Sequence, residues 1–425
     1  MSAEPTPSQT SDGPRAVAIA RQPIHDRSRR VVGYELLFRG TGDEEQATTS
    51  VIVETFTGVG VDAIAGRKPA HVRVSRRFLL ELHAFALPPD RVVLEVAAPG
   101  GDDAALAAVL ERLAAERYRV SLACAPDAPP PAAPPHVADS VKVDVTGLGE
   151  PQIAALARRL RTNGTTLIAA GVDTPALLQQ CLVAGFDHFQ GFFFCTPDVV
   201  RAQAPPTAGI AQLRTLAGLY AADTTFEQFE QVIARDVGLS YRLLCYLNSA
   251  FFGLRREVAS VREALTLLGM RTVRRWATLM ALSGTQDKPH ELIVTALLRA
   301  RMCEAIGRAT ARGPSTAGEQ DACFTIGLLS VTDALLDAPL AQALEPLPLA
   351  ESSRAALLER RGPMGAALSA VLAYERGELA EAQRHAPGVA LGELYLSALA
   401  WADAASAGVE RSTIETSAST TSGAN

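Results

Sequence analysis

The sequence predicts an α/β domain followed by an all-helical domain, in which the α/β part forms an incomplete (β/α) barrel of the TIM type. Over residues 15–205, short β-rich runs alternate with amphipathic helical runs. From about residue 207 onward, apolar residues recur at helical spacing throughout. Strands that alternate with crossover helices form a parallel sheet, and eight of them indicate a closed barrel.

The first half contains eight candidate strands. They are "AVAIARQPI", "VVGYELLF", "AHVRVS", "RVVLEVA", "YRVSLAC", "SVKVDV", "TTLIAAGV" and "HFQGFFF". Only "HDRSRR" separates the first two, which is too short for a helix, so we expect these two strands to be antiparallel. The segment "APDAPPPAAPPHVADS" between the fifth and sixth is too rich in proline for a regular helix. We therefore expect a missing helix and an open barrel wall on that side.

Proline and polar residues mark the domain boundaries. Pro205 and Pro206 separate the barrel, residues 15–205, from the helical domain, residues 206–407. The polar N-terminus, residues 1–14, and the Ser/Thr-rich tail, residues 408–425, are expected to be disordered.

Composition excludes several classes of protein. The 425 residues are 48% hydrophobic and carry 40 basic against 46 acidic side chains, a net charge of −6 that disfavours sequence-independent nucleic-acid binding. No apolar stretch reaches the roughly 18 residues of a membrane span, and the N-terminus lacks the features of a signal peptide. The six cysteines form no C-x-x-C pair and are expected to be buried thiols. These features predict a soluble, cytoplasmic protein.

Motifs in both halves resemble known families. The segment "RQPIHDRSRRVVGYELLFRG", followed in order by "VVLEV", "VKVD", "AGVDT" and "FDHFQGFFF", resembles the EAL domain of cyclic di-GMP phosphodiesterases. In the second half, "LLCYLNSAFFGLRREVASVREALTLLGMRTVRRWATLMAL" resembles the core of an HDOD domain, and "GLLSVTDALL" and "LAYERGE" fit the same EAL–HDOD subgroup. The resemblance covers nearly the whole chain and implies an EAL barrel fused to an HDOD domain.

The catalytic positions implied by the EAL resemblance are largely substituted. EAL chemistry uses two metal ions held by carboxylates and an amide. Of these positions, Glu35, Glu95, Lys142, Asp144 and Gln190 keep the family residue, whereas Arg73, Ala98, Ala123, Cys124 and Ala170 replace an asparagine, a glutamate, two aspartates and a glutamate. So few oxygen ligands predict no metal, no cofactor and a chain that is not an enzyme.

Two hypotheses concern the substituted pocket. Arg73 could stand in for the metal between Glu35 and Glu95, because two buried carboxylates need a cation, or it could turn outward to solvent. Gln22, Arg39, Arg73 and Gln190 are candidate contacts for cyclic di-GMP, with Arg39 matching the family arginine that contacts phosphate. The alternatives are that Gln22 only shapes the barrel mouth and that Arg39 is a surface charge.

The second half also lacks the residues for metal chemistry. HDOD domains resemble HD-type phosphohydrolases, which need a His-Asp pair, but Ser330 and Val331 stand at the expected position. Phe251 and Phe252 are read as core packing or as a partner contact. The dense arginines between 255 and 275 are read as solvated helix faces, a surface for an acidic protein partner, or a nucleic-acid patch.

The function predicted from these features is a non-catalytic signalling scaffold or adaptor. It would act through protein partners in cyclic di-GMP-linked control of motility, pili or biofilm. The alternatives are a cyclic di-GMP receptor that does not hydrolyse the nucleotide and a residual phosphodiesterase. A homodimer through the open barrel side is also considered, and nucleic acid is not expected as a partner.

Overall fold

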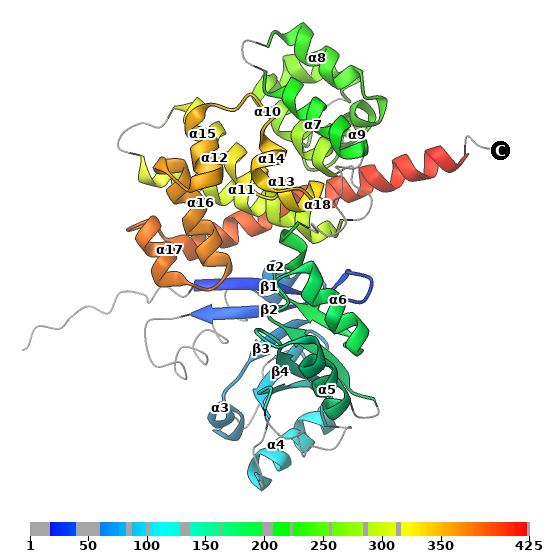
Figure 1. Cartoon of the computed structure of the whole chain (residues 1–425), viewed down its shortest axis with the longest axis vertical. Helices are drawn as coiled ribbons and strands as arrows, with labels where there is room; N and C mark the ends of the chain where they lie inside the picture. Colours follow the sequence, from blue (N-terminus) through cyan, green and yellow to red (C-terminus); the bar gives the residue numbers. More distant parts are fainter. Residues whose placement is uncertain are drawn as a thin grey trace, which may run out of the picture.

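The computed structural model places a barrel beside a helical domain (Figure 1). It describes residues 18–39, 60–81, 87–98, 103–127, 137–161, 164–197, 207–221, 224–254, 257–283, 288–311 and 316–422. The N-terminal stretch 1–14 lies outside these residues. No helix among them is long and apolar enough to cross a membrane.

Eight strands form a closed barrel in chain order. They are β1 (Ala18–Asp26), β2 (Val31–Arg39), β3 (Ala70–Arg73), β4 (Val92–Ala97), β5 (Arg119–Cys124), β6 (Ser140–Asp144), β7 (Thr166–Ala170) and β8 (His188–Gln190). Strand β1 is antiparallel to β2 and to β8, and the other neighbours are parallel. The predicted mixed fold and the antiparallel first pair are thus confirmed.

The expected open wall between the fifth and sixth strands is wrong. Strand β5 pairs directly with β6, from Ser121 opposite Ser140 to Cys124 opposite Val143. Backbone hydrogen bonds hold a sheet together, so an irregular connection outside the strands does not open it. The described parts of that connection, 125–127 and 137–139, contain no helix. Closure leaves no open edge between β5 and β6 for the homodimer that was considered through that side.

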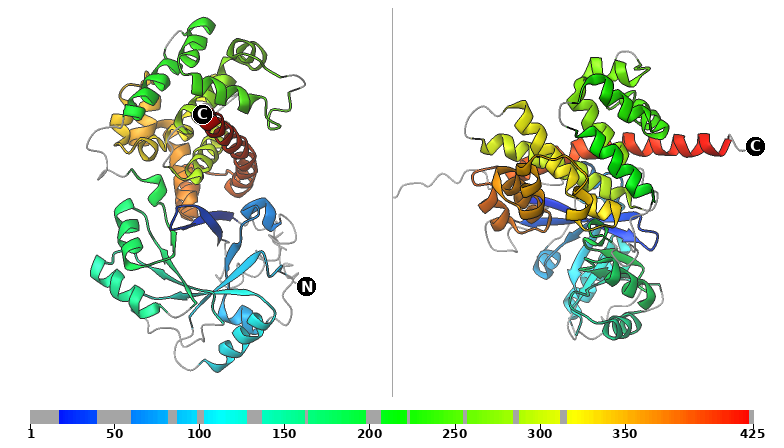
Figure 2. Two further views of the ribbon diagram at one scale, coloured as in Figure 1. Left: turned by 90° about the vertical axis from the view of Figure 1, so that its right-hand side faces the viewer. Right: turned by 45° about the horizontal axis from the view of Figure 1, so that its top comes forward.

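Short helices surround the barrel, as the cyan and green ribbons in the left view of Figure 2 show. They are α2 (Val61–Ala65), α3 (Arg76–Glu81), α4 (Ala104–Ala115), α5 (Glu150–Leu160), α6 (Pro175–Ala184) and the 3₁₀ turn η2 (Phe193–Cys195). Helix α4 shows why these segments are helical. Its N-cap Asp103 accepts a hydrogen bond from the backbone of Leu106, and Leu106, Leu110 and Leu113 form its buried face.

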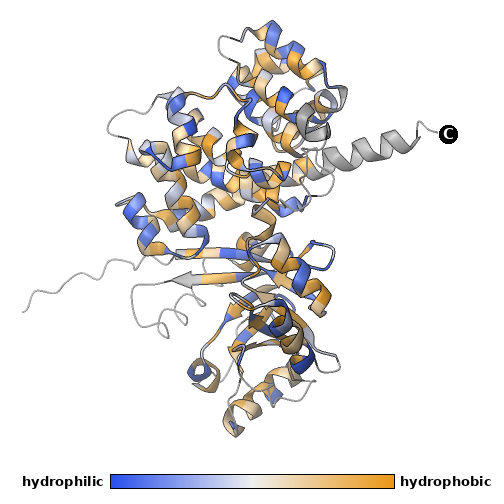
Figure 3. Ribbon diagram, viewed as in Figure 1, coloured by the Kyte–Doolittle hydropathy of each residue, from blue (hydrophilic) through white to orange (hydrophobic). Residues whose placement is uncertain are grey.

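The second domain is helical throughout. Its helices are α7 (Thr207–Leu219), α8 (Phe226–Ala234), α9 (Val237–Leu247), α10 (Val261–Ser283), α11 (His290–Thr310), α12 (Ala317–Leu329), α13 (Thr332–Leu336), α14 (Leu340–Leu344), α15 (Glu351–Glu359), α16 (Gly362–Glu375), α17 (Leu379–His385) and α18 (Leu391–Ser422). Helix α11 is buried over most of its length and lies at the centre, where apolar residues gather (Figure 3). Helix α18 continues to Ser422, through most of the stretch expected as a disordered tail, because 409–422 contain neither glycine nor proline.

The outer face of β1 and β2 packs against the helical domain (Figure 1). Arg21 in β1 donates two hydrogen bonds to the carboxylate of Asp403 in α18, at 2.9 and 2.7 Å. The Tyr34 hydroxyl in β2 donates to Glu291 in α11 at 2.9 Å, and the Tyr374 hydroxyl donates to the carbonyl of Ile19 at 2.9 Å. Buried polar contacts therefore fix the helical domain on this hairpin.

Candidate functional site

The candidate site is a cavity at the mouth of the barrel. Side chains two residues apart on a strand point to the same face, so each strand sends alternate residues into the barrel. Register places Gln22 beside Glu35 and Arg73 beside Glu95. The cavity has a volume of about 250 Å³ and is lined by Gln22, Glu35, Leu37, Arg73, Ala123, Cys124, Lys142, Asp144, Ala170, Gly171 and Gln190.

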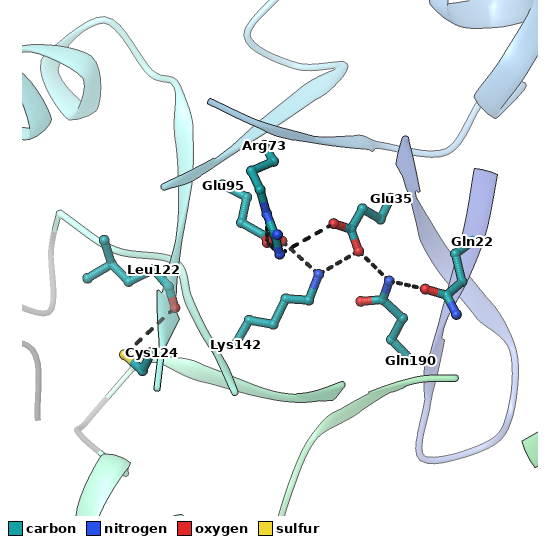
Figure 4. A network of polar contacts seen from close by, with 8 residues as sticks. All are labelled: Gln22, Glu35, Arg73, Glu95, Leu122, Cys124, Lys142 and Gln190. Atoms are coloured by element: carbon teal, nitrogen blue, oxygen red, sulfur yellow. Dashed lines mark hydrogen bonds and ion pairs between the residues drawn. The ribbon is translucent and has the colours of Figure 1, made fainter. Parts of the chain in front are cut away.

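Lys142 is the buried cation of this site (Figure 4). Its ammonium nitrogen lies 2.6 Å from Glu35 Oε2 and 2.9 Å from Glu95 Oε2. All three side chains are almost fully buried. A lysine that donates to two carboxylates offsets the cost of burying them, and the cluster would be unstable without it.

Arg73 lies above this pair at the mouth of the cavity. Its Nε and Nη2 donate to Glu95 Oε1 at 3.2 and 3.0 Å, and Nη2 lies 3.8 Å from Glu35 Oε1. The side chain is nevertheless 65% exposed. Arg73 therefore contacts both carboxylates, as hypothesised, while it also faces solvent, as the alternative reading held.

Gln190 and Gln22 extend the network to the first and last strands. The side-chain amide of Gln190 donates to Gln22 Oε1 at 2.7 Å and also to Glu35 Oε2. The carbonyl oxygen Oε1 of Gln190 is buried and has no partner in the described structure. A buried acceptor without a donor is costly, so this oxygen is suited to accept a hydrogen bond from a ligand.

The opposite charges of Glu35 and Lys142 keep both side chains ionised. Burial by itself would raise the pKa of Glu35, but the charge of Lys142 and the hydrogen bonds from Gln190 and Lys142 lower it below its ordinary value. Burial would likewise lower the pKa of Lys142, but the carboxylates of Glu35 and Glu95 raise it. Proton exchange at neutral pH is thus disfavoured at both groups.

The donor set does not fit a divalent metal ion as it is arranged. Calcium and magnesium take six or more oxygen ligands. Here Glu35 and Glu95 both bind Lys142, and Arg73 contacts both of them. Within the described ranges, no group of three or more His, Cys, Asp or Glu is placed to hold a metal ion.

The structure gathers most of the residues singled out from the sequence. The candidates that line the cavity are Gln22, Glu35, Arg73, Ala123, Cys124, Lys142, Asp144, Ala170 and Gln190. Glu95 contacts Lys142 beneath the cavity. Ala98 does not line it; its backbone N–H donates to the carbonyl of Ala123 at 2.8 Å, and its side chain packs against the core. Arg39 ends β2 opposite Ala18, but its side chain lies outside the described part of the chain.

Sequence reasoning missed Gly171 in this wall. Its φ of +74° is strained for other residues, and a Cβ atom would come within 2.1 Å of Thr146 Oγ1 and 2.6 Å of Asp144 Oδ1. The glycine therefore leaves room for the Asp144 carboxylate at the cavity edge. A glycine directly after a strand, as in "LIAAGVD", was the signal available in the sequence.

In the helical domain, the position expected for a His-Asp pair is part of the packing. The Ser330 hydroxyl donates to the carbonyl of Gly327 at 2.7 Å, and Val331 is fully buried. Next to Ser330, the guanidinium of Arg299 binds the carboxylate of Glu375, with the shortest contact at 2.7 Å. A buried ion pair between Arg299 and Glu375 therefore occupies this region and contributes to its packing.

Comparisons with known proteins find an HDOD match in the helical part and relatives along most of the chain. A family model described as the HDOD domain matches residues 206–360. The chain is 28% identical to "Cyclic di-GMP phosphodiesterase CdgJ" of Vibrio cholerae over 86% of this chain and 87% of that protein. It is 26% identical to "Uncharacterized protein YuxH" of Bacillus subtilis over 91% and 98%. The solved structure of the Bacillus subtilis YkuI protein, with an EAL domain, in complex with c-di-GMP and calcium, is 16% identical, covers 60% of this chain and 72% of that chain, and has a TM-score of 0.34.

One prediction from the sequence is corrected by these comparisons. The substituted ligand positions predicted a chain that is not an enzyme. That prediction is wrong, because a relative that matches this chain over most of its length is named a cyclic di-GMP phosphodiesterase. The number of metal-ligand positions that keep the family residue is therefore not enough to decide whether a chain is an enzyme.

Proposed function

Because this chain is an EAL–HDOD protein, we propose that its barrel recognises cyclic di-GMP and that the chain takes part in signalling by this nucleotide. The observation that carries the proposal is the exposed guanidinium of Arg73 at the mouth of the cavity. The guanidinium of Arg73 is held in place by Glu95 and still presents 65% of its side chain to solvent. Such a group can pair with a phosphodiester in a fixed orientation.

Neighbouring groups supply contacts of a different kind. Gln190 offers its unpartnered Oε1 as an acceptor for a base N–H, and the amide of Gln22 lies beside it. The cavity of about 250 Å³ is smaller than the roughly 300–1,000 Å³ of sites that enclose a drug-sized ligand. A cyclic dinucleotide would therefore insert one part and rest the remainder on the exposed mouth.

Isothermal titration with cyclic di-GMP tests this proposal. We expect saturable heat from the intact chain, and binding weakened about tenfold or more in Arg73→Ala, as the loss of a charged hydrogen bond implies. Arg76→Ala is the matched control, because Arg76 is an exposed arginine on the next helix that pairs with Asp103. Equal affinity in the Arg73 and Arg76 variants, or no heat at any concentration, would contradict the proposal.

A second candidate is cyclic di-GMP phosphodiesterase activity, which the name of the Vibrio cholerae relative favours. The same samples, with and without magnesium, should be separated by chromatography after titration to look for linear product. Glu35→Gln tests whether any such activity belongs to the barrel, because Glu35 lines the cavity. Product that forms equally in this variant would place the activity elsewhere or in a contaminant.

An output through protein partners, as the sequence predicts, stays a prediction, as does a homodimer. Size-exclusion chromatography with light scattering measures the oligomeric state directly. A shift in that state on adding cyclic di-GMP would link the barrel to assembly.

A further inference from the structure

We propose that the helical domain carries a second small-molecule site, which takes a purine nucleotide. A cavity of about 690 Å³ opens where α10, α11, α12 and α18 meet, within the range of small-ligand sites. Its described lining includes Phe251, Arg271, Arg275, Trp276, Arg301 and Trp401. The lining combines aromatic rings with arginines, the two side-chain types that recognise bases and phosphates.

Aromatic rings form one part of the wall. The rings of Trp276 and Trp401 lie 5.8 Å apart at an angle of 37°, and Phe251 lies 5.4 Å from Trp276 and 6.1 Å from Trp401. Trp276 is almost buried, whereas Trp401 and Phe251 are half-buried. The guanidinium of Arg301 lies over the Trp401 ring, 5.6 Å from its centroid, so a planar base would stack on the exposed part of these rings beside it.

Three arginines supply the charge. Arg275 and Arg301 each donate to the carboxylate of the buried Glu304, at 3.0 and 2.6 Å, and Arg275 also donates to Asp321 at 2.7 Å. Arg271 is the exposed member of the three. Together with the carboxylates of Glu304 and Asp321, the three arginines leave an excess of one positive charge at the cavity, which favours an anionic ligand.

The backbone of α10 adds to this preference. The helix is interrupted at Gly269, which has φ +80° and ψ +155°, so that its second half begins at the cavity with Met270, Arg271 and Thr272. The first turn of a helix carries a partial positive charge. The kink thus directs the start of a helix toward the same space as the arginines.

The dense arginines between 255 and 275 lie in different environments. Arg262 pairs with Glu230 on α8, and Arg274 lies over the rings of Tyr220 and Phe229. Only Arg271 and Arg275 of the described members reach the cavity. This separation favours a small anionic ligand over an extended acidic protein or nucleic acid.

Tryptophan fluorescence can test this site alone, because the chain has only two tryptophans and both line the cavity. The full-length chain should be titrated with GMP, with N-acetyltryptophanamide titrated alongside to correct for light absorbed by the purine. We expect saturable quenching by GMP, and apparent affinity lowered about tenfold or more in Arg271→Ala, as the loss of a charged contact implies.

Two controls keep the test decisive. Arg262→Ala removes an exposed arginine of the same helix, away from the cavity, and should leave the quenching curve unchanged. Arg73→Ala in the barrel should also leave it unchanged, which separates this site from the proposed cyclic di-GMP site. No saturable quenching, equal quenching in Arg271→Ala, or loss of quenching in Arg73→Ala would each overturn the proposal.

Discussion

Replacing Lys142 by methionine should destabilise the barrel strongly at neutral pH. Methionine keeps the approximate length of the side chain but removes the only buried cation described between Glu35 and Glu95. Breaking a buried ion pair by removing one partner costs about 3–5 kcal/mol. Arg73 is too exposed to replace Lys142, because solvent screens an exposed charge. We therefore expect a loss of about 3 kcal/mol or more in the free energy of unfolding.

The loss should depend on pH with a definite sign. The folded-state pKa of Glu35 is lowered in the wild type, so its stabilising contribution is present above the ordinary value of 4.5 and is lost as the pH falls through the folded pKa. Without Lys142, burial would raise that pKa, and the variant would lose stability as the pH rises. The difference between the two proteins should therefore shrink at acidic pH.

Urea unfolding followed by far-UV circular dichroism measures this difference at neutral pH and near pH 4.5. Both tryptophans lie in the helical domain, so their fluorescence would not report on the barrel. Adding Glu35→Gln to Lys142→Met should restore part of the stability, because one unpaired charge is removed. A loss below about 1 kcal/mol, the size of an exposed pair, or a loss that does not change with pH would refute the reasoning.

Four further changes can be measured by thermal or urea unfolding. Arg73→Asn should lower stability measurably but by less than about 1 kcal/mol, because the side chain is largely exposed, and an unchanged melting temperature would contradict its place in the cluster. Burial lowers the pKa of His25 from 6.5 to about 4, so the contribution of His25 to stability should fall by about 3 kcal/mol as the pH drops through this range, and His25→Phe should reduce the pH dependence of stability by that amount. Gly171→Ala should cost about 1–3 kcal/mol, because the left-handed backbone is strained and the new methyl group collides with two side chains; a neutral effect would mean that the turn can relax. Arg21→Met should cost about 2–3 kcal/mol by breaking the pair with Asp403, and a smaller loss would show that the domain interface does not depend on this contact.

Local patterns in the sequence were sufficient to predict the elements of this protein. Short β-rich runs mark all eight strands, and a six-residue connection cannot hold a crossover helix, so the antiparallel start of the barrel follows from length alone. Helical periodicity after Pro206 predicts the second domain for the same reason. These properties depend on neighbours in the sequence, which a pattern records directly.

The site was predicted only in part. The resemblance to EAL domains brought Glu35, Glu95, Lys142 and Gln190 together on one list, but it did not show that the Lys142 ammonium lies between the two carboxylates. The reading of Arg73 as the cation of the site was also incomplete. Lys142 is the buried cation and Arg73 the exposed one, a distinction that depends on the depth of each strand position in the barrel.

Other features belong to the tertiary structure alone. The sequence predicted an open barrel wall, but β5 and β6 close it through backbone pairing that no side-chain pattern encodes. Phe251, Arg271, Arg301 and Trp401 are far apart in the chain, yet they line one cavity because the helices that carry them pack together. Periodicity determines which residues form a helix or strand, whereas packing between distant elements determines which side chains meet. For that reason the sequence by itself determined the elements and the family resemblance, and the tertiary structure decided the closure of the barrel, the position of its charges and the cavity in the helical domain.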